Sequence, residues 1–154
     1  MLEWMLVLLP TMGLITAFFD VSYALFCWST IQNSVREGCR YAITFQTQSG
    51  LGQDASIKQI VATNSMGIIP NTNPSLVSVN YFTQTNPNTA IAAPNGNVPG
   101  NIVEVSVQNF PLVWMAPISG TIISPYRSTS PATINVYSSD VLGGYPAGLT
   151  SVTR

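Results

Sequence analysis

A nearly uninterrupted apolar run, from Met1 to Trp28, opens the chain and constrains its fold more than any other feature. Glu3 and Asp20 are the two charges within this run. About 20 apolar residues at roughly 1.5 Å each cross the hydrocarbon layer of a membrane, so the run is long enough for one spanning helix. Because the rest of the chain is polar and rich in turns, we expect an apolar helical stalk that carries a soluble head. Such a stalk is either a membrane anchor or a surface for assembly.

Charged residues are scarce in this chain. They make up 7% of its 154 residues, against roughly 25% in ordinary soluble proteins. Free monomers usually stay soluble through charge, whereas a subunit surrounded by copies of itself has less need of it. The low charge therefore favours assembly. The net charge of −1 provides no basic surface, so we expect no nucleic-acid partner.

Helical periodicity continues beyond the apolar run. An apolar stripe at helical spacing is formed by Ile31, Val35, Cys39 and Ala42. We predict one helix from about residue 2 to about residue 47, closed by the glycine of Ser49-Gly50. Pro10 removes one backbone hydrogen bond inside this helix, which is tolerated where neighbours satisfy the freed carbonyl. Residues 1–28 should protrude as the assembly or membrane segment of this N-terminal unit, residues 1–48, and its amphipathic half should lie along the head.

The head, residues 49–154, is predicted to be rich in β-structure. A short helix should begin at Asp54, as N-cap, and end near Asn64 to Gly67. Three strands follow, the third at Thr133 to Ser138, and each has one apolar face; the apolar residues are Val77, Val79 and Tyr81, then Val103, Val105 and Val107, then Ile134 and Val136. The amphipathic half of the long helix supplies the cover that such a sheet needs. The predicted fold class is α+β, a long protruding helix packed on a small antiparallel sheet.

Three further segments have no clear period. Phe110 to Pro125 is apolar, and it either folds over an edge of the sheet or forms a contact surface. The stretches 86–99 and 143–154 are rich in turn-forming residues, so we expect both to be irregular.

The two cysteines, Cys27 and Cys39, cannot bridge within one continuous helix. Twelve residues separate them by about 18 Å, whereas a disulfide needs Cα atoms within roughly 7 Å. Either both are small buried thiols in helix packing, or they form a disulfide between neighbouring subunits.

Residues for the common kinds of catalysis are missing from the sequence. Histidine is absent, which excludes Ser-His-Asp and Cys-His units and histidine metal sites. There is no CxxC pair and no glycine-rich phosphate loop. We therefore predict that the protein is not an enzyme and uses no cofactor.

The apolar run does not resemble a signal peptide, because it has no basic start, is long, and ends without a small-residue cleavage site. Arg36 and Arg40 follow the run, so the positive-inside rule would place the head in the cytoplasm. Removal of a basic leader before Met1 would reverse that expectation.

Several N-terminal features occur in a fixed order: Leu2-Glu3-Trp4, Val7-Leu8-Leu9-Pro10, Asp20, Gln32-Asn33 and Arg36-Glu37-Gly38-Cys39-Arg40-Tyr41-Ala42. Over about residues 2–45 this order resembles the TadE-type pilin-like proteins of the tight-adherence secretion apparatus. The resemblance implies a type IV pilin-like fold, removal of a short basic leader by a prepilin peptidase, and packing of the apolar helices in the core of a filament. Pilins usually carry their glutamate two residues further in than Glu3.

The charged residues of the helix then acquire expected roles. Glu3 should pair with the α-amino group of an adjacent subunit, or else lie at the membrane surface. Asp20, about 25 Å further along, is expected to pair with Arg36 or Arg40 of a neighbouring subunit. Glu37 is the alternative partner of those arginines within the same helix.

Three functions are open at this point: a structural subunit of an extracellular pilus-like filament, a minor or priming pseudopilin of a tight-adherence system, and a bitopic membrane-anchored binding module. The low charge and the apolar segment 110–125 favour the first over the third, whereas the family resemblance favours the second; we predict the filament subunit. Its partners would be copies of itself, inner-membrane lipid before assembly, the prepilin peptidase and the pilus assembly machinery. It would function at the cell surface.

Overall fold

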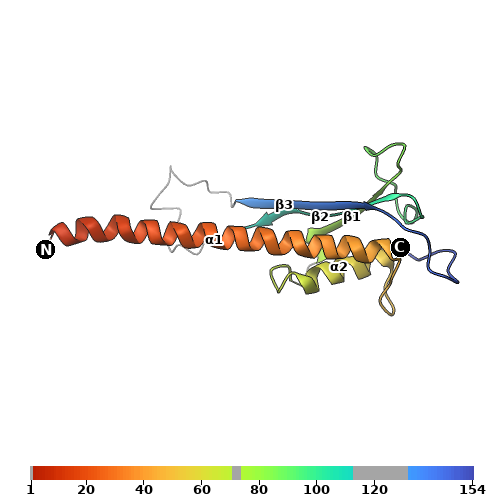
Figure 1. Cartoon of the computed structure of the whole chain (residues 1–154), viewed down its shortest axis with the longest axis horizontal. Coiled ribbons are helices and arrows are strands. Elements are labelled where there is room, and N and C mark those ends of the chain that lie inside the picture. The colour runs from red at the N-terminus through yellow and green to blue at the C-terminus, as the bar shows by residue number, and fades with distance from the viewer. Residues whose placement is uncertain (1, 71–73, 113–131) are drawn as a thin grey trace.

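A computed structural model of the chain describes residues 2–70, 74–112 and 132–154. The elements follow in the order α1 (Leu2–Ile43), α2 (Gln53–Asn64), the 3-10 turn η1 (Pro74–Leu76), β1 (Val77–Phe82), β2 (Ile102–Pro111) and β3 (Thr133–Val141). One half of α1 lies along the head, and the other half projects far beyond it (Figure 1). The predicted α+β class, a long N-terminal helix with a small antiparallel sheet, is confirmed.

The sheet has three antiparallel strands in the order β1-β2-β3. All eight apolar strand residues that the alternation predicted to face inward are buried. The pairing explains this, because Val79 lies opposite Val105 and Val107 lies opposite Val136, so that the apolar side chains share one face. The third strand extends three residues beyond its predicted end.

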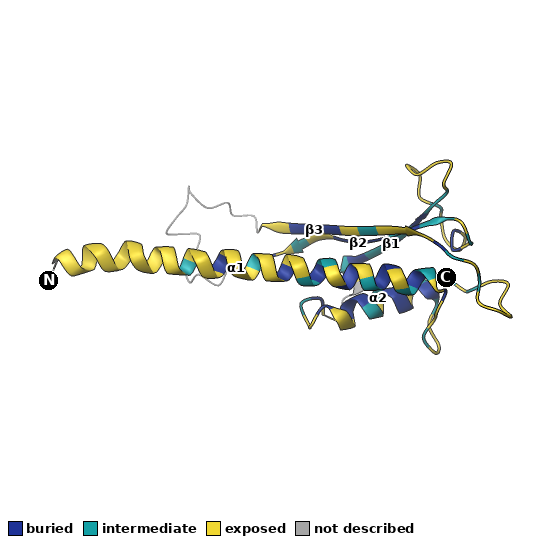
Figure 2. Ribbon diagram, in the orientation of Figure 1, coloured by how far each residue is buried: buried dark blue, intermediate teal, exposed yellow. Residues whose placement is uncertain are grey.

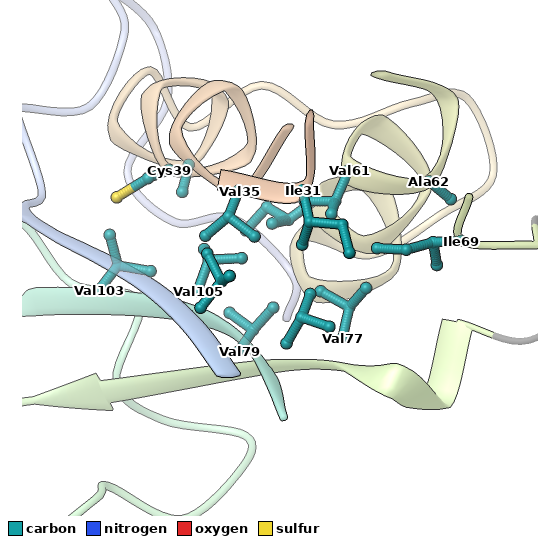
Figure 3. Packing of buried hydrophobic residues seen from close by; sticks show 14 of the residues in the cluster. Ile31, Val35, Cys39, Val61, Ala62, Ile69, Val77, Val79, Val103 and Val105 are labelled. Carbon is teal, nitrogen blue, oxygen red and sulfur yellow. The ribbon is translucent and has the colours of Figure 1, made fainter. Parts of the chain in front are cut away.

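Both helices cover this apolar face side by side (Figure 3). The predicted stripe of α1 is buried throughout, from Ile31 to Ala42. α1 packs against β2 and β3, α2 packs against β1, and Val61 lies between the two helices. The amphipathic half of α1 is therefore part of the core of the head, as the periodicity predicted.

The long helix ends four residues before its predicted end. Phe45 adopts a left-handed conformation, with φ of 52°, and its ring is buried against Tyr145 with the ring centroids 4.6 Å apart. Burial of this ring offsets the local backbone strain. The prediction that Ser49-Gly50 closes the helix is therefore wrong.

Asp54 is not the N-cap of the second helix. Gly52 occupies that position, without a side-chain cap. A Cβ at Gly52 would lie 2.7 Å from the carbonyl oxygen of Arg154, so glycine is needed where the end of the chain crosses the start of α2. Asp54 instead makes contacts across the head, which are described below.

The predicted irregular stretches, 86–99 and 143–154, contain no helix or strand. Of the apolar segment 110–125, Phe110 and Pro111 end β2 and Leu112 is buried. The remainder of that segment lies outside the described residues.

Close packing of α1 on α2 depends on Gly38, because a Cβ there would overlap Cγ2 of Val61. We expect Gly38→Ala to lower the free energy of unfolding by about 1–3 kcal/mol, the usual cost of overpacking. Gly13→Ala is the matched control, since no atom lies within 4 Å of a Cβ at this other glycine of α1. Thermal unfolding followed by circular dichroism would measure both. Equal melting temperatures for the two variants would contradict the packing role of Gly38.

Candidate functional site

The projecting half of α1 carries an extensive exposed apolar surface. Sixteen large hydrophobic side chains between Trp4 and Trp28 are exposed, and the exposed fractions of Trp4 and Phe18 are 82% and 72%. Figure 2 shows this half exposed almost all round, in contrast to the buried stripe of the other half. Exposed apolar surface of this extent is rare on monomers and marks a site of membrane or protein contact.

This helix is long and apolar enough to cross a membrane by length and composition, and its most apolar part is not buried within the chain. Its hydroxyl groups suit such surroundings, because they bond within the helix. Thr11 Oγ1 donates to the carbonyl of Val7 at 2.7 Å, and Thr16 Oγ1 donates to that of Met12 at 3.0 Å. Pro10 lies inside α1 without ending it. The projecting half is thus a continuous rod with few unsatisfied polar groups.

The charges of this half differ in their surroundings. Glu3 is exposed near the tip, whereas Asp20 is 9% exposed and already has an interaction partner within its own chain. Arg36 is exposed on the same helix, but 16 residues of helix separate it from Asp20 by about 24 Å. A contact between Asp20 and Arg36 can therefore form only between two chains.

Arg40 has an intrahelical partner. Its Nη1 atom lies 3.2 Å from Oε1 of Glu37, in a pair that is exposed on both sides. This is the alternative foreseen from the sequence, and exposed pairs of this kind contribute little to stability. Arg40 is therefore held less firmly than a buried ion pair would hold it.

Both cysteines are free and buried, Cys27 at the start of the core stripe and Cys39 in its middle. Their burial favours the interpretation as small packing residues. A bridge between subunits would require the core to open around one of them.

A polar network ties the end of the chain to the head, and sequence patterns did not reveal it. Arg154 Nε donates to Oδ2 of Asp54 at 2.8 Å, and its Nη1 donates to the carbonyls of Ile91 and Asn95. The guanidinium lies over the ring of Tyr81, 4.6 Å from its centroid. This C-terminal latch, centred on Asp54, Tyr81 and Arg154, joins α2, β1 and the tail.

Tyr81 is the buried member of the latch, and its hydroxyl donates to Oδ1 of Asp54 at 2.8 Å. Burial raises the pKa of Tyr81 most, and the nearby Asp54 carboxylate raises it further, while Arg154 lowers it. The phenol therefore stays protonated where an exposed tyrosine ionises.

A second buried contact supports the latch from the same end. Gln53 donates from Nε2 to the last-turn carbonyl of Ala42, and its Oε1 accepts from Nδ2 of Asn97. Asn97 also donates to the carbonyl of Val152 at 2.7 Å. A buried polar group that loses its hydrogen-bond partner is unfavourable. The network therefore holds α1, α2 and the tail in one arrangement.

A groove of about 740 Å³ lies beside the latch, between α2 and the loop around Pro94. Asp54 and Arg154 line it but neutralise each other, which leaves Lys58 as its third charged side chain. Small apolar residues make up much of the remaining lining.

Tyr81→Phe tests the latch through its pH dependence. Because the pKa is raised in the folded state, wild-type stability is complete below the unfolded value of about 10 and falls at higher pH by up to about 1.4 kcal/mol per pH unit. The variant should lose about 1 kcal/mol at pH 8 but should show a shallower decline between pH 9 and pH 11. Melting temperatures across this range measure both effects. Tyr137→Phe, at an exposed tyrosine, is the control, and parallel declines in Tyr81→Phe and wild type would contradict the proposed role.

No family model matches this chain, and neither the curated proteins nor the solved structures contain a significant match to it.

Proposed function

We propose that the protein is a structural subunit of an extracellular type IV pilus-like filament that assembles through the projecting half of α1. The observation that carries the proposal is the division of a single helix. The stripe from Cys27 to Ala42 is built into the core of a folded head, while sixteen large apolar side chains between Trp4 and Trp28 are left exposed. An exposed apolar helix that is fixed to a folded head can pack against the same helix of other copies. Together these helices would form a common apolar core.

Hydrophobic burial would supply the driving force. Complete burial of a large apolar side chain contributes about 1.5–3 kcal/mol, so sixteen of them contribute tens of kcal/mol before ordering costs are subtracted. An ion pair contributes far less. Glu3 and Asp20 would therefore set the register between subunits rather than hold them together.

Two features support assembly over simple anchoring. Lipid alone offers no partner to the exposed carboxylate of Glu3, whereas a neighbouring subunit offers an α-amino group. The low charge of the chain also suits a subunit surrounded by copies of itself. Before assembly the same helix would lie in the inner membrane as part of a precursor. A prepilin peptidase and the pilus assembly machinery are the partners implied by the TadE-like resemblance.

Two other functions remain as alternatives. A minor or priming pseudopilin of a tight-adherence system would share this fold and differ in copy number. A bitopic binding module would use α1 only as an anchor. Assembly into fibres separates these alternatives from the proposal.

Electron microscopy of the purified full-length protein after detergent removal, and of material sheared from cells, is the direct test. We expect uniform thin fibres made mainly of this chain. Phe18→Lys should abolish them, because it places a charge on the rod at a position exposed in the single chain. Thr63→Lys, at an exposed position of α2, should leave them intact. Detergent-dependent monomers of the wild type would contradict the proposal and favour an anchor or a minor pseudopilin.

A charge-neutral substitution, Asp20→Asn, tests the register contact. We expect shorter fibres whose length depends less on salt, because the pair with Arg36 or Arg40 of a neighbouring subunit, which salt screens, is lost. Glu37→Gln is the matched control, since it removes a carboxylate near the same arginines and leaves Arg40 without its intrahelical partner. Fibre length and salt resistance are measured by microscopy and sedimentation. Unchanged Asp20→Asn fibres would overturn the pairing while leaving the filament function intact.

A further inference from the structure

A polar hollow of about 300 Å³ lies on the outer face of the sheet, between β2 and β3. This face is turned away from α1 and α2, which cover the other side (Figure 1). The side chains that line the hollow from this face are Glu104, Ser106 and Gln108 of β2 and Asn135 and Tyr137 of β3. The hollow is therefore not part of the surface that α1 presents.

The hydroxyl group of Ser106, within this hollow, is buried without a hydrogen-bond partner in the structure. Ser106 is 2% exposed, and its Oγ atom has no hydrogen-bond partner. In the part of the chain that the structure describes, it is the one buried side-chain polar atom in this condition. Leaving a buried hydroxyl unpaired is unfavourable, whereas an alanine would fill the same position without that cost. An unpaired hydroxyl in a hollow indicates a partner from outside the chain.

The neighbouring strand supplies an aromatic side chain beside this hydroxyl. Tyr137 lies directly opposite Ser106 in the sheet, and its exposed fraction is 70%. Side chains of directly opposed residues share one face. Because the side chains of Tyr137 and Gln108 are exposed, a ligand can reach Ser106 by displacing them.

A β-bulge shapes the end of the hollow. The register between β2 and β3 shifts between Val107 and Phe110, and Asn109 takes a left-handed φ of 55° there. The backbone N–H of Asn109 donates to Oδ1 of Asn135 at 2.7 Å. The oxygen of this amide is thereby occupied, which leaves its NH₂ group as a donor toward the hollow.

The lining selects a class of ligand. Among the described residues that line it, Glu104 is the one charged side chain, so phosphate and carboxylate groups are disfavoured. The side chain of Val136 points to the core, so an apolar anchor has no pocket to fill. What remains is an exposed aromatic ring with carboxylate, amide and hydroxyl groups around it. This combination suits a ring that has an apolar face and many hydroxyl groups.

We propose that this hollow binds a neutral saccharide, with one sugar ring stacked on Tyr137 and a sugar hydroxyl bonded to Ser106 Oγ. Glu104 accepts hydrogen bonds from sugar hydroxyls, and the NH₂ groups of Gln108 and Asn135 donate to them. The volume is at the small end of the range for ligand pockets, which suits the end of a short oligosaccharide. No described residue of α1 lines the hollow, so a single chain already presents it.

Saturation-transfer difference NMR tests the proposal with the full-length chain in a detergent that carries no sugar headgroup. The probes are neutral tetrasaccharides of glucose, galactose, mannose and N-acetylglucosamine. We expect transfer to at least one of them, and at least tenfold weaker binding by Tyr137→Ala and by Ser106→Ala. Tyr137→Phe should retain most of the affinity, because it keeps the stacking ring.

Two measurements separate binding from folding. Ser106→Ala should keep or raise the melting temperature, because it removes an unpaired buried hydroxyl. Ser78→Ala, opposite Ser106 on β1 but outside the lining, should leave affinity unchanged. Absence of transfer to all four probes would overturn the proposal, as would binding that survives both alanine substitutions in the hollow.

Discussion

The structure depends on the contact between one stripe of α1 and the apolar face of the sheet. Three short strands with one apolar face cannot bury that face by themselves, and the stripe from Ile31 to Ala42 covers it together with α2. Because a helix is stiff, fixing this half also fixes the direction in which the other half projects. The exposed rod and the folded head are therefore two results of a single packing event.

Hydrophobic periodicity predicted the elements of the fold and their buried faces, but it did not predict features that depend on contacts between distant segments. The helical stripe and the strand alternation placed nearly every inward-facing residue, since burial on one face leaves a periodic trace in the sequence. The end of α1 was misplaced because Phe45 is held by Tyr145, a partner a hundred residues away. The same holds for Asp54, whose residue type suits an N-cap but whose partners Tyr81 and Arg154 come from distant segments.

The candidate site was predictable to a similar degree. Composition alone identified the apolar rod and the two carboxylates within it, because both are local facts. It could not show that Asp20 is largely buried in its own chain while Glu3 is exposed. Nor could it single out Ser106, since a serine on the outer face of a strand is unremarkable until its hydroxyl is found closed off and unpaired.

The alignment of α1 with the strands has a mechanical consequence. Figure 1 shows the axis of α1 running nearly along the strands, with the projecting half continuing the same line. A pull on that half, directed along its axis, loads the contacts of the buried stripe all at once, in shear. Such a load does not peel them away one after another, as a pull across the helix would. At the other end of the head, the latch fastens the C-terminal tail to α2 and β1. The tail is therefore held in place when a force acts on the projecting half of α1.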